Sequence, residues 1–378
     1  MKVTSEQELA EAIRGANGPL RVQGGGTRDI GRPVAGERLE VGISSVTLYD
    51  PGALTLVVGA GTPLAEIEAL LAGERQRLGF EPMDHRPLFG TEGVPTIGGV
   101  VAANVSGPRR IQAGAARDFT LGARFVDGSG RIIKNGGRVM KNVTGYDLVK
   151  LLSGSWGTLG VLSEVSLKVQ AVPETEATLM ARGLDLDAAI AALSRALGSP
   201  YDVSGAAHLG DARGTFVRIE GLAGMVEHRT RALQAGALAG WERVDGAESA
   251  EIWREIRDLT HLAGTPDAVW RVSLRPTDAP VFARALGEAG LDFSAVYDWG
   301  GGLAWVAVDP APDDAGAQAL RSALAPLGGH ATLVRAAREV REKIAVFEPQ
   351  SNPLAAISRG LKQKFDPRGI LNPGLMGV

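Results

Sequence analysis

The stretch Val22-Gln23-Gly24-Gly25-Gly26-Thr27-Arg28-Asp29 leads from a short strand candidate, Leu20 to Gln23, directly into three consecutive glycines. Successive unhindered backbone amides can turn toward a phosphate and form an anion-binding nest, to which the Thr27 hydroxyl adds a donor. Glycine triplets are also common in flexible turns, so the meaning of this stretch depends on the rest of the chain.

A second glycine-rich segment reads Pro95-Thr96-Ile97-Gly98-Gly99-Val100-Val101-Ala102-Ala103-Asn104-Val105-Ser106-Gly107. Small residues at nearly every position would let the backbone lie close against a large flat ligand. Thr96, Asn104 and Ser106 could form hydrogen bonds with phosphate or with ring edges. A tightly packed helix start is the alternative, but it does not explain why polar residues accompany the glycines.

A third segment runs from Lys141 to Leu148 and continues as Ser153-Gly154-Ser155-Trp156-Gly157-Thr158-Leu159-Gly160 before a strand candidate that begins at Val161. A turn that opens directly into a strand leaves the Val161 amide and carbonyl able to pair with the edge of an adenine or another ring system. Tyr146 and Trp156 could belong to the ligand site, but aromatic residues of this kind more commonly pack in the core.

Composition excludes several classes of protein. The chain has 378 residues, which favours two domains, and its formal net charge of -3 offers no footprint for nucleic acid. It has no cysteine, so disulfides, iron–sulfur clusters, cysteine-ligated zinc and a flavin bound through sulfur are excluded within it. The sequence indicates no metal site.

The apolar runs are too short for a membrane span. At the N-terminus, Thr4-Ser5-Glu6-Gln7 is typical of a helix capping box and not of a secretion signal. We therefore expect a cytoplasmic protein, with any association with the inner membrane peripheral and mediated by partner subunits.

The pattern of short strands, glycine loops and helices predicts an α+β fold. Thr62-Pro63 should begin a helix with a buried stripe of Leu64, Ile67, Leu70 and Leu71, and Asp127-Gly128-Ser129-Gly130 should close a hairpin. After Pro173 the glycine loops become fewer. Helices are expected at 186–197, 248–262, 336–346 and 354–364, and strands at 54–58, 161–169, 215–219 and 269–274.

Together, the three glycine-rich segments resemble the PCMH-type FAD-binding domain of the vanillyl-alcohol-oxidase-like superfamily, in order and in approximate spacing. The resemblance covers residues 6–172 and resumes at Phe365-Asp366-Pro367-Arg368-Gly369-Ile370-Leu371-Asn372-Pro373-Gly374, which is similar to the closing signature of FAD-linked oxidases. It implies an FAD-binding domain of two α+β subdomains at 1–172, an α+β substrate-side domain at 173–335, and a helical segment at 336–378 that packs back toward the FAD domain.

The resemblance also implies the cofactor residues. In that family the first loop holds the FAD pyrophosphate, the second segment lines the pyrophosphate and the isoalloxazine, and the third lies at the adenine side. The FAD is expected to be non-covalent, because tethered relatives carry histidine where this chain has Thr27 and then Arg28. The implied cofactor residues are Gly24, Gly25, Gly26, Thr27, Arg28, Asp29, Pro95, Thr96, Gly98, Gly99, Asn104, Ser106, Gly107, Gly160 and Val161.

Within the superfamily, Pro108-Arg109-Arg110, Arg117-Asp118-Phe119 and the segment from Met140 to Leu148 most resemble the FAD-binding E subunits of bacterial glycolate oxidase. That resemblance implies oxidation of glycolate to glyoxylate in a complex with a second flavoprotein subunit and an iron–sulfur subunit. Two alternatives stay open. One is a stand-alone FAD-dependent oxidase or dehydrogenase of another small 2-hydroxy acid or alcohol, and the other is a flavin-less scaffold subunit.

The catalytic residues are not identified by any motif. The five histidines are isolated in the sequence, and the segment from Tyr297 to Gly302 has glycines where hydroxy-acid-oxidising relatives carry a histidine-rich metal and base site. We therefore favour the hypothesis that this FAD relays electrons. If the chain oxidises substrate itself, Arg109 or Arg110 could hold a carboxylate, with Lys141 or Tyr146 near the flavin, although surface positions are the commoner role for such residues.

Overall fold

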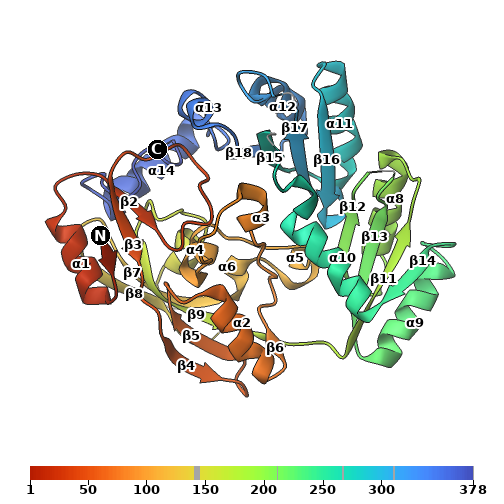
Figure 1. Ribbon diagram of the computed structural model, residues 1–378, viewed down its shortest axis with the longest axis horizontal. Coiled ribbons are helices and arrows are strands. Elements are labelled where there is room, and N and C mark those ends of the chain that lie inside the picture. Colours follow the sequence, from red (N-terminus) through yellow and green to blue (C-terminus); the bar gives the residue numbers. More distant parts are fainter. Residues whose placement is uncertain (140–144, 211, 266–267, 310, 378) are drawn as a thin grey trace.

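The computed structural model describes residues 1–378 except 140–144, 211, 266–267, 310 and 378. The fold is α+β, as predicted, and it has two lobes (Figure 1). The first lobe contains the strands up to residue 171, and the second contains the strands from residue 175 onward. These sheet memberships support the proposed domain boundary after residue 172.

Three sheets make up the first lobe, in the strand orders β1-β3-β2, β10-β6 and β4-β5-β9-β7-β8. The hairpin predicted at Asp127 to Gly130 is confirmed, because it joins β7 to β8 in an antiparallel pair. The strands are β1 (Lys2–Val3), β2 (Leu20–Gln23), β3 (Glu37–Val41), β4 (Val46–Asp50), β5 (Thr55–Gly59), β6 (Gln76–Arg77), β7 (Thr120–Val126), β8 (Ile132–Gly136), β9 (Val161–Lys168) and β10 (Gln170–Ala171).

The first helix begins where the sequence places its cap, because Ser5 accepts a hydrogen bond from the Glu8 amide. The second helix begins at Leu64, just after the expected Thr62-Pro63, and has no side-chain cap. It buries Leu64, Ile67 and Leu71 as expected, while Leu70 is only partly buried. The helices are α1 (Glu6–Gly15), α2 (Leu64–Gly73), α3 (Arg86–Phe89), α4 (Ile97–Ala102), α5 (Arg110–Ala113), α6 (Ala116–Phe119) and α7 (Leu148–Leu152).

The second lobe is built on one 8-stranded antiparallel sheet in the order β14-β11-β13-β12-β16-β17-β15-β18. Its two halves meet where β12 pairs with β16 at His208 and Tyr297. The strands are β11 (Thr175–Ala181), β12 (Val203–His208), β13 (Thr215–Gly221), β14 (Glu242–Asp245), β15 (Ala268–Ser273), β16 (Phe293–Asp298), β17 (Leu303–Val308) and β18 (His330–Arg335).

Helices and short 3-10 turns pack on this sheet. The helix expected at 248–262 is split, because Leu259 adopts a left-handed conformation between a helix and a 3-10 turn. The elements are α8 (Leu186–Leu197), α9 (Ala223–Gln234), α10 (Gly246–Asp258), η1 (Thr260–Leu262), η2 (Pro276–Asp278), α11 (Ala279–Glu288), η3 (Trp299–Gly301), α12 (Ala317–Leu324) and η4 (Ala325–Leu327).

The C-terminal segment lies against the first lobe. It contains α13 (Arg338–Lys343), shorter than the helix expected at 336–346, and α14 (Asn352–Phe365). Beyond α14, Leu371 forms a parallel bridge with Leu20 of β2, and the Gly128 amide donates to the Phe365 carbonyl oxygen at 2.8 Å. Figure 1 shows this segment, in blue, beside β2. These contacts support the proposal that residues 336–378 pack back toward the FAD domain.

A buried cluster of charges joins the two lobes. Arg109 Nε donates to Glu220 Oε2 at 2.9 Å, and Arg77 Nη1 donates to Glu220 Oε1 at 2.6 Å. Arg218 of β13 reaches back to Glu81 of the first lobe at 3.0 Å and 2.9 Å. Breaking a buried ion pair leaves a charge without compensation, so these contacts hold the lobes in a fixed relation.

Among the helices that the structure describes, none is long and apolar enough to cross a membrane.

Candidate functional site

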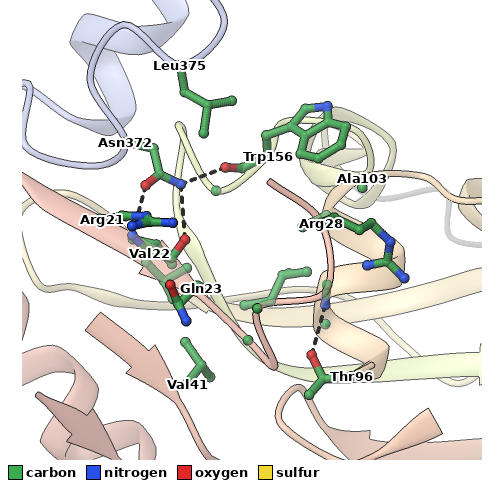
Figure 2. Close-up of a pocket in the computed structure, with 18 of the residues that line it drawn as sticks. Arg21, Val22, Gln23, Arg28, Val41, Thr96, Ala103, Trp156, Asn372 and Leu375 are labelled. Carbon is green, nitrogen blue, oxygen red and sulfur yellow. Dashed lines mark hydrogen bonds between the residues drawn. The ribbon is translucent and has the colours of Figure 1, made fainter. Parts of the chain in front are cut away.

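A cavity of about 360 Å³ opens in the first lobe beside the glycine triplet (Figure 2). Its wall contains 11 of the 15 cofactor residues that the sequence implies. These residues are Gly24, Gly25, Gly26, Thr27, Arg28, Asp29, Thr96, Gly98, Gly99, Gly160 and Val161. Residues 21–23, 102–103 and 155–157, with Asn372 and Leu375, complete much of the remaining wall.

The glycine triplet is required by close packing of two loops. A Cβ atom on Gly25 would overlap the Val94 carbonyl oxygen, and one on Gly24 would overlap the Thr96 hydroxyl. Gly26 has a φ of +71°, a conformation that favours glycine. The three glycines therefore let the loop after β2 lie against the segment that leads into α4.

Hydrogen-bond donors on this loop have no protein acceptor. The amides of Gly25, Gly26 and Thr27 form no hydrogen bond with any residue that the structure describes. Beside them, Arg28 Nε donates to His85 Nδ1 at 3.1 Å, while Arg28 Nη2 is buried and finds no partner within the described residues. A buried donor without a partner, such as Arg28 Nη2, is costly, and consecutive amides without a protein acceptor can bind an anion, so this set is suited to a ligand such as a pyrophosphate.

The charge states of Arg28 and His85 are consistent with the binding of an anionic ligand. Burial lowers the pKa of Arg28 to about 10, against an opposing effect of Asp84, so the guanidinium stays cationic at neutral pH. Burial, together with the charge of Arg28, also lowers the pKa of His85 well below its usual range. His85 is therefore a neutral acceptor that orients Arg28 and leaves its charge available to the cavity.

Asn372, in the C-terminal segment, joins two parts of the cavity wall by hydrogen bonds. Its Oδ1 accepts a hydrogen bond from the Val22 amide at 2.8 Å, and its Nδ2 donates to the Trp156 carbonyl oxygen at 2.8 Å (Figure 2). Trp156 lines the cavity and packs edge-on against Phe347, with ring centroids 5.8 Å apart. The sequence reasoning missed Asn372 as a site residue, although it belongs to the closing signature.

Four of the implied cofactor residues lie outside the cavity wall and instead accept hydrogen bonds from other residues of the protein. The Pro95 carbonyl oxygen accepts from the Leu64 amide at 2.8 Å. Asn104 Oδ1 and Ser106 Oγ accept from the Arg117 and Ala116 amides, each at 3.0 Å. The fourth, Gly107, accepts from Trp299 Nε1 at 3.1 Å and so links the two lobes.

The four residues considered for substrate contact lie in different places. Arg109 is buried, and its guanidinium is committed to Glu220 in the interlobe cluster. The Arg110 guanidinium lies over the Trp299 ring, 4.6 Å from the ring centroid. Tyr146 is 89% exposed and is not part of the cavity wall, so it does not pack in the core either. Lys141 lies outside the described residues.

A metal centre is not indicated. Across the described ranges, no group of three or more histidine, aspartate or glutamate side chains is arranged to hold a metal ion.

Comparisons with known proteins first define the class. Residues 1–136 match the family model described as an FAD binding domain. The solved structure of an alkyldihydroxyacetonephosphate synthase covers 99% of this chain and 76% of its own, with a TM-score of 0.69 at 16% identity. The fold class predicted from sequence, an FAD-binding domain followed by an α+β domain, is thereby confirmed.

A more specific likeness follows from sequence. The glycolate oxidase subunit GlcE of Escherichia coli is 37% identical over 361 residues, which are 95% of this chain and 92% of that protein. The chain therefore belongs to the family of glycolate oxidase subunit GlcE, which confirms the resemblance seen in the sequence. The glycolate oxidase subunit GlcD of Bacillus subtilis is 42% identical over 101 residues, 27% of this chain and 22% of that protein.

Proposed function

We propose that this chain is the FAD-binding subunit of a complex that oxidises glycolate to glyoxylate. The observation that carries the proposal is the set of unpaired donors, the Gly25 to Thr27 amides and Arg28 Nη2, on residues that line one cavity in a chain of the GlcE family. FAD, when bound, supplies an acceptor for the hydride from the hydroxyl-bearing carbon of the substrate.

In this proposal different residues of the cavity wall bind different parts of FAD. The amides after β2 and the Arg28 guanidinium hold the pyrophosphate, because both are donors and Arg28 is cationic. Thr96, Gly98 and Gly99 lie along the pyrophosphate and the isoalloxazine, and Gly160 and Val161 lie at the adenine side. The FAD is held without a covalent bond, since Thr27 occupies the position at which tethered relatives carry histidine.

The proposed partners are a second flavoprotein subunit and an iron–sulfur subunit, at the cytoplasmic face of the inner membrane. Two similar proteins, from different bacteria, are each named as a subunit of a glycolate oxidase, which supports a multi-subunit enzyme over a stand-alone oxidase. The unpaired donors in the cavity disfavour a flavin-less scaffold. The role of this FAD, as an electron relay or as the direct acceptor from glycolate, depends on whether the chain binds a carboxylate itself.

The first experiment is the visible absorption spectrum of the purified chain, repeated on the supernatant after acid precipitation. A flavin spectrum that acid releases into the supernatant is the expected result. A chain that takes up no flavin even when FAD is supplied would overturn the proposal. Anaerobic addition of glycolate then separates the two roles, because bleaching requires oxidation by this chain, and an unchanged spectrum supports a relay.

A variant tests the part played by Arg28. Arg28→Met removes the cation and should weaken FAD binding by roughly tenfold to a hundredfold, the effect of one charged hydrogen bond. Arg195→Met, at an exposed arginine on α8, is the matched control and should bind FAD as the parent does. Equal FAD affinity in Arg28→Met and the parent would remove Arg28 from the cofactor site.

A further inference from the structure

Trp299 lies where the two lobes meet. It begins η3 directly after β16, and its indole Nε1 donates to the Gly107 carbonyl oxygen of the first lobe at 3.1 Å. Its amide donates to Asp298 Oδ1 at 2.6 Å, and its φ of +53° is in the left-handed region, which costs energy for a tryptophan. The indole ring is therefore held in place from both lobes.

Two arginines lie over this ring. The Arg110 guanidinium, from α5 of the first lobe, is 4.6 Å from the ring centroid, and the Arg271 guanidinium, from β15 of the second lobe, is 5.2 Å from it. Both side chains are partly buried, and each guanidinium carbon is within the range of a cation–π contact with the indole. The Trp299 ring thus contacts one arginine from each lobe.

Neither arginine forms a hydrogen bond or an ion pair with a carboxylate among the described residues. Asp118 is the acidic group whose charge acts on Arg110, and it does so without a direct ion pair. The other arginines at the lobe interface differ, because Arg109, Arg218 and Arg257 are each paired directly with a carboxylate. The two guanidinium groups over Trp299 therefore have no direct carboxylate contact within the described residues.

The electrostatics agree with the geometry. Burial, and then the nearby charge of Arg110, lower the pKa of Arg271 to about 10, and burial lowers the pKa of Arg110 against an opposing effect of Asp118. Both groups are still cations at neutral pH and repel one another, so an anion between them would relieve a standing cost.

Two observations relate this cationic pair to the cavity. Trp299 donates to Gly107, which belongs to the same glycine-rich segment as Gly98 and Gly99 of the cavity wall. The charge of Arg271 also acts on His85, which accepts a hydrogen bond from Arg28 of the cavity wall. The pair is thus linked to the cavity through Gly107 and through His85.

We propose that Arg110 and Arg271, supported by the Trp299 ring, bind the carboxylate of a small 2-hydroxy acid substrate. The inference rests on the proposed function and deepens it. Guanidinium forks match a carboxylate in two parallel hydrogen bonds, which a lysine cannot reproduce. A small monocarboxylate suits a site that is partly buried between lobes better than an acidic side chain of a partner protein does. Substrate binding here favours direct oxidation at this chain's FAD over an electron relay.

The test is calorimetric titration of the FAD-loaded chain with glycolate and with glycolamide, which has the same shape without the charge. The parent should bind glycolate and should not measurably bind glycolamide. Arg110→Met and Arg271→Met should each weaken glycolate binding by about tenfold or more. Arg359→Met, at an exposed arginine on α14 without a partner among the described residues, should leave glycolate binding unchanged.

Several results would overturn the inference. Glycolate affinity unchanged in both variants, or no glycolate binding by the FAD-loaded parent, would remove the carboxylate site. Loss of partner assembly in the variants, with glycolate binding intact, would instead assign the two arginines to docking of an acidic partner residue. If Arg271→Met does not fold, Arg271→Lys keeps the charge without the fork and should still bind glycolate more weakly than the parent. The flavin spectrum of each sample separates failure of this inference, with FAD present, from failure of the proposed function, with FAD absent.

Discussion

Asn372 Oδ1 accepts a hydrogen bond from the Val22 amide at 2.8 Å, although the two residues stand 350 positions apart. Val22 belongs to the strand that leads into the glycine triplet, and Asn372 also holds the Trp156 carbonyl oxygen. One side chain from the C-terminal segment thus fixes two walls of the cavity that is proposed to hold FAD.

Replacing this side chain should weaken the fold and the cofactor site together. Asn372→Ala removes both hydrogen bonds and leaves a buried amide and carbonyl without partners, so the free energy of unfolding should fall by about 2 kcal/mol. Urea unfolding of the variant, with FAD per chain measured on the same sample, checks this. Gln363→Ala, at an exposed position on α14, is the control and should leave both quantities unchanged. An unfolding free energy equal to the parent's would show that the two hydrogen bonds contribute nothing net.

The glycines of the chain should differ sharply in their tolerance of alanine. Gly25→Ala places a Cβ atom on the Val94 carbonyl oxygen, so the loop must move and the chain should retain much less FAD. Gly224→Ala, on α9, meets no atom within 4 Å and should instead raise the free energy of unfolding, by up to about 1 kcal/mol. Retention of FAD by Gly25→Ala at the parent's level would contradict the close packing of the two loops.

Much of the local structure could be predicted from sequence because it depends on neighbouring residues. The helix at 186–197 and the strand at 20–23 have the predicted bounds, and the helix expected to begin at Thr62-Pro63 begins at the next residue, Leu64. The glycine triplet indicated a tightly packed loop, and only glycine fits the close approach of Gly25 to Val94.

The parts that sequence did not reveal depend on contacts between distant segments. Arg110, Arg271 and Trp299 come from three separate parts of the chain, and no spacing in the sequence predicts that they lie together. Arg109 stands beside Arg110 and has the same chemistry, yet Glu220 of the second lobe commits it to a structural cluster. Only the packing of the two lobes decides which of these arginines is paired.

Acid should loosen the contact between the lobes. Burial alone would raise the pKa of Glu81, but Arg218 and Arg109 outweigh it and lower that pKa to about 2. Since the pKa in the unfolded chain is about 4.3, this carboxylate stabilises the fold above that pH and loses its contribution as the pH falls toward 2, worth about 3 kcal/mol. Urea unfolding between pH 7 and pH 2 should show the loss, and Glu81→Gln should be less stable at pH 7 with a flatter dependence. Parallel curves for the parent and the variant would contradict this role of Glu81.

Asp298 should make the fold less stable as the pH rises, the opposite of the effect of Glu81. Burial, with a smaller contribution from Glu81, raises its pKa to about 7, against the hydrogen bond from the Trp299 amide and the charge of Arg218. The protonated acid therefore stabilises the fold below its unfolded pKa of about 3.9, and this contribution is lost as the pH rises through 7, by up to about 4 kcal/mol. Asp298→Asn has nearly the same shape and does not titrate, so the difference in unfolding free energy between it and the parent should change across pH 4 to 8. A constant difference would show that Asp298 does not carry the raised pKa.

The bridge between Leu20 and Leu371, with Asn372 and Leu375 in the cavity wall, bears on the order in which the molecule is made. During translation the strand that leads into the glycine triplet is made about 350 residues before Asn372, which pairs with it. A nascent chain can form the strands of the first lobe, but it cannot complete the wall of this cavity until Asn372 and Leu375 have been added. The cavity is therefore completed after both lobes have been synthesised, and a chain cut before Asn372 would keep the cavity open.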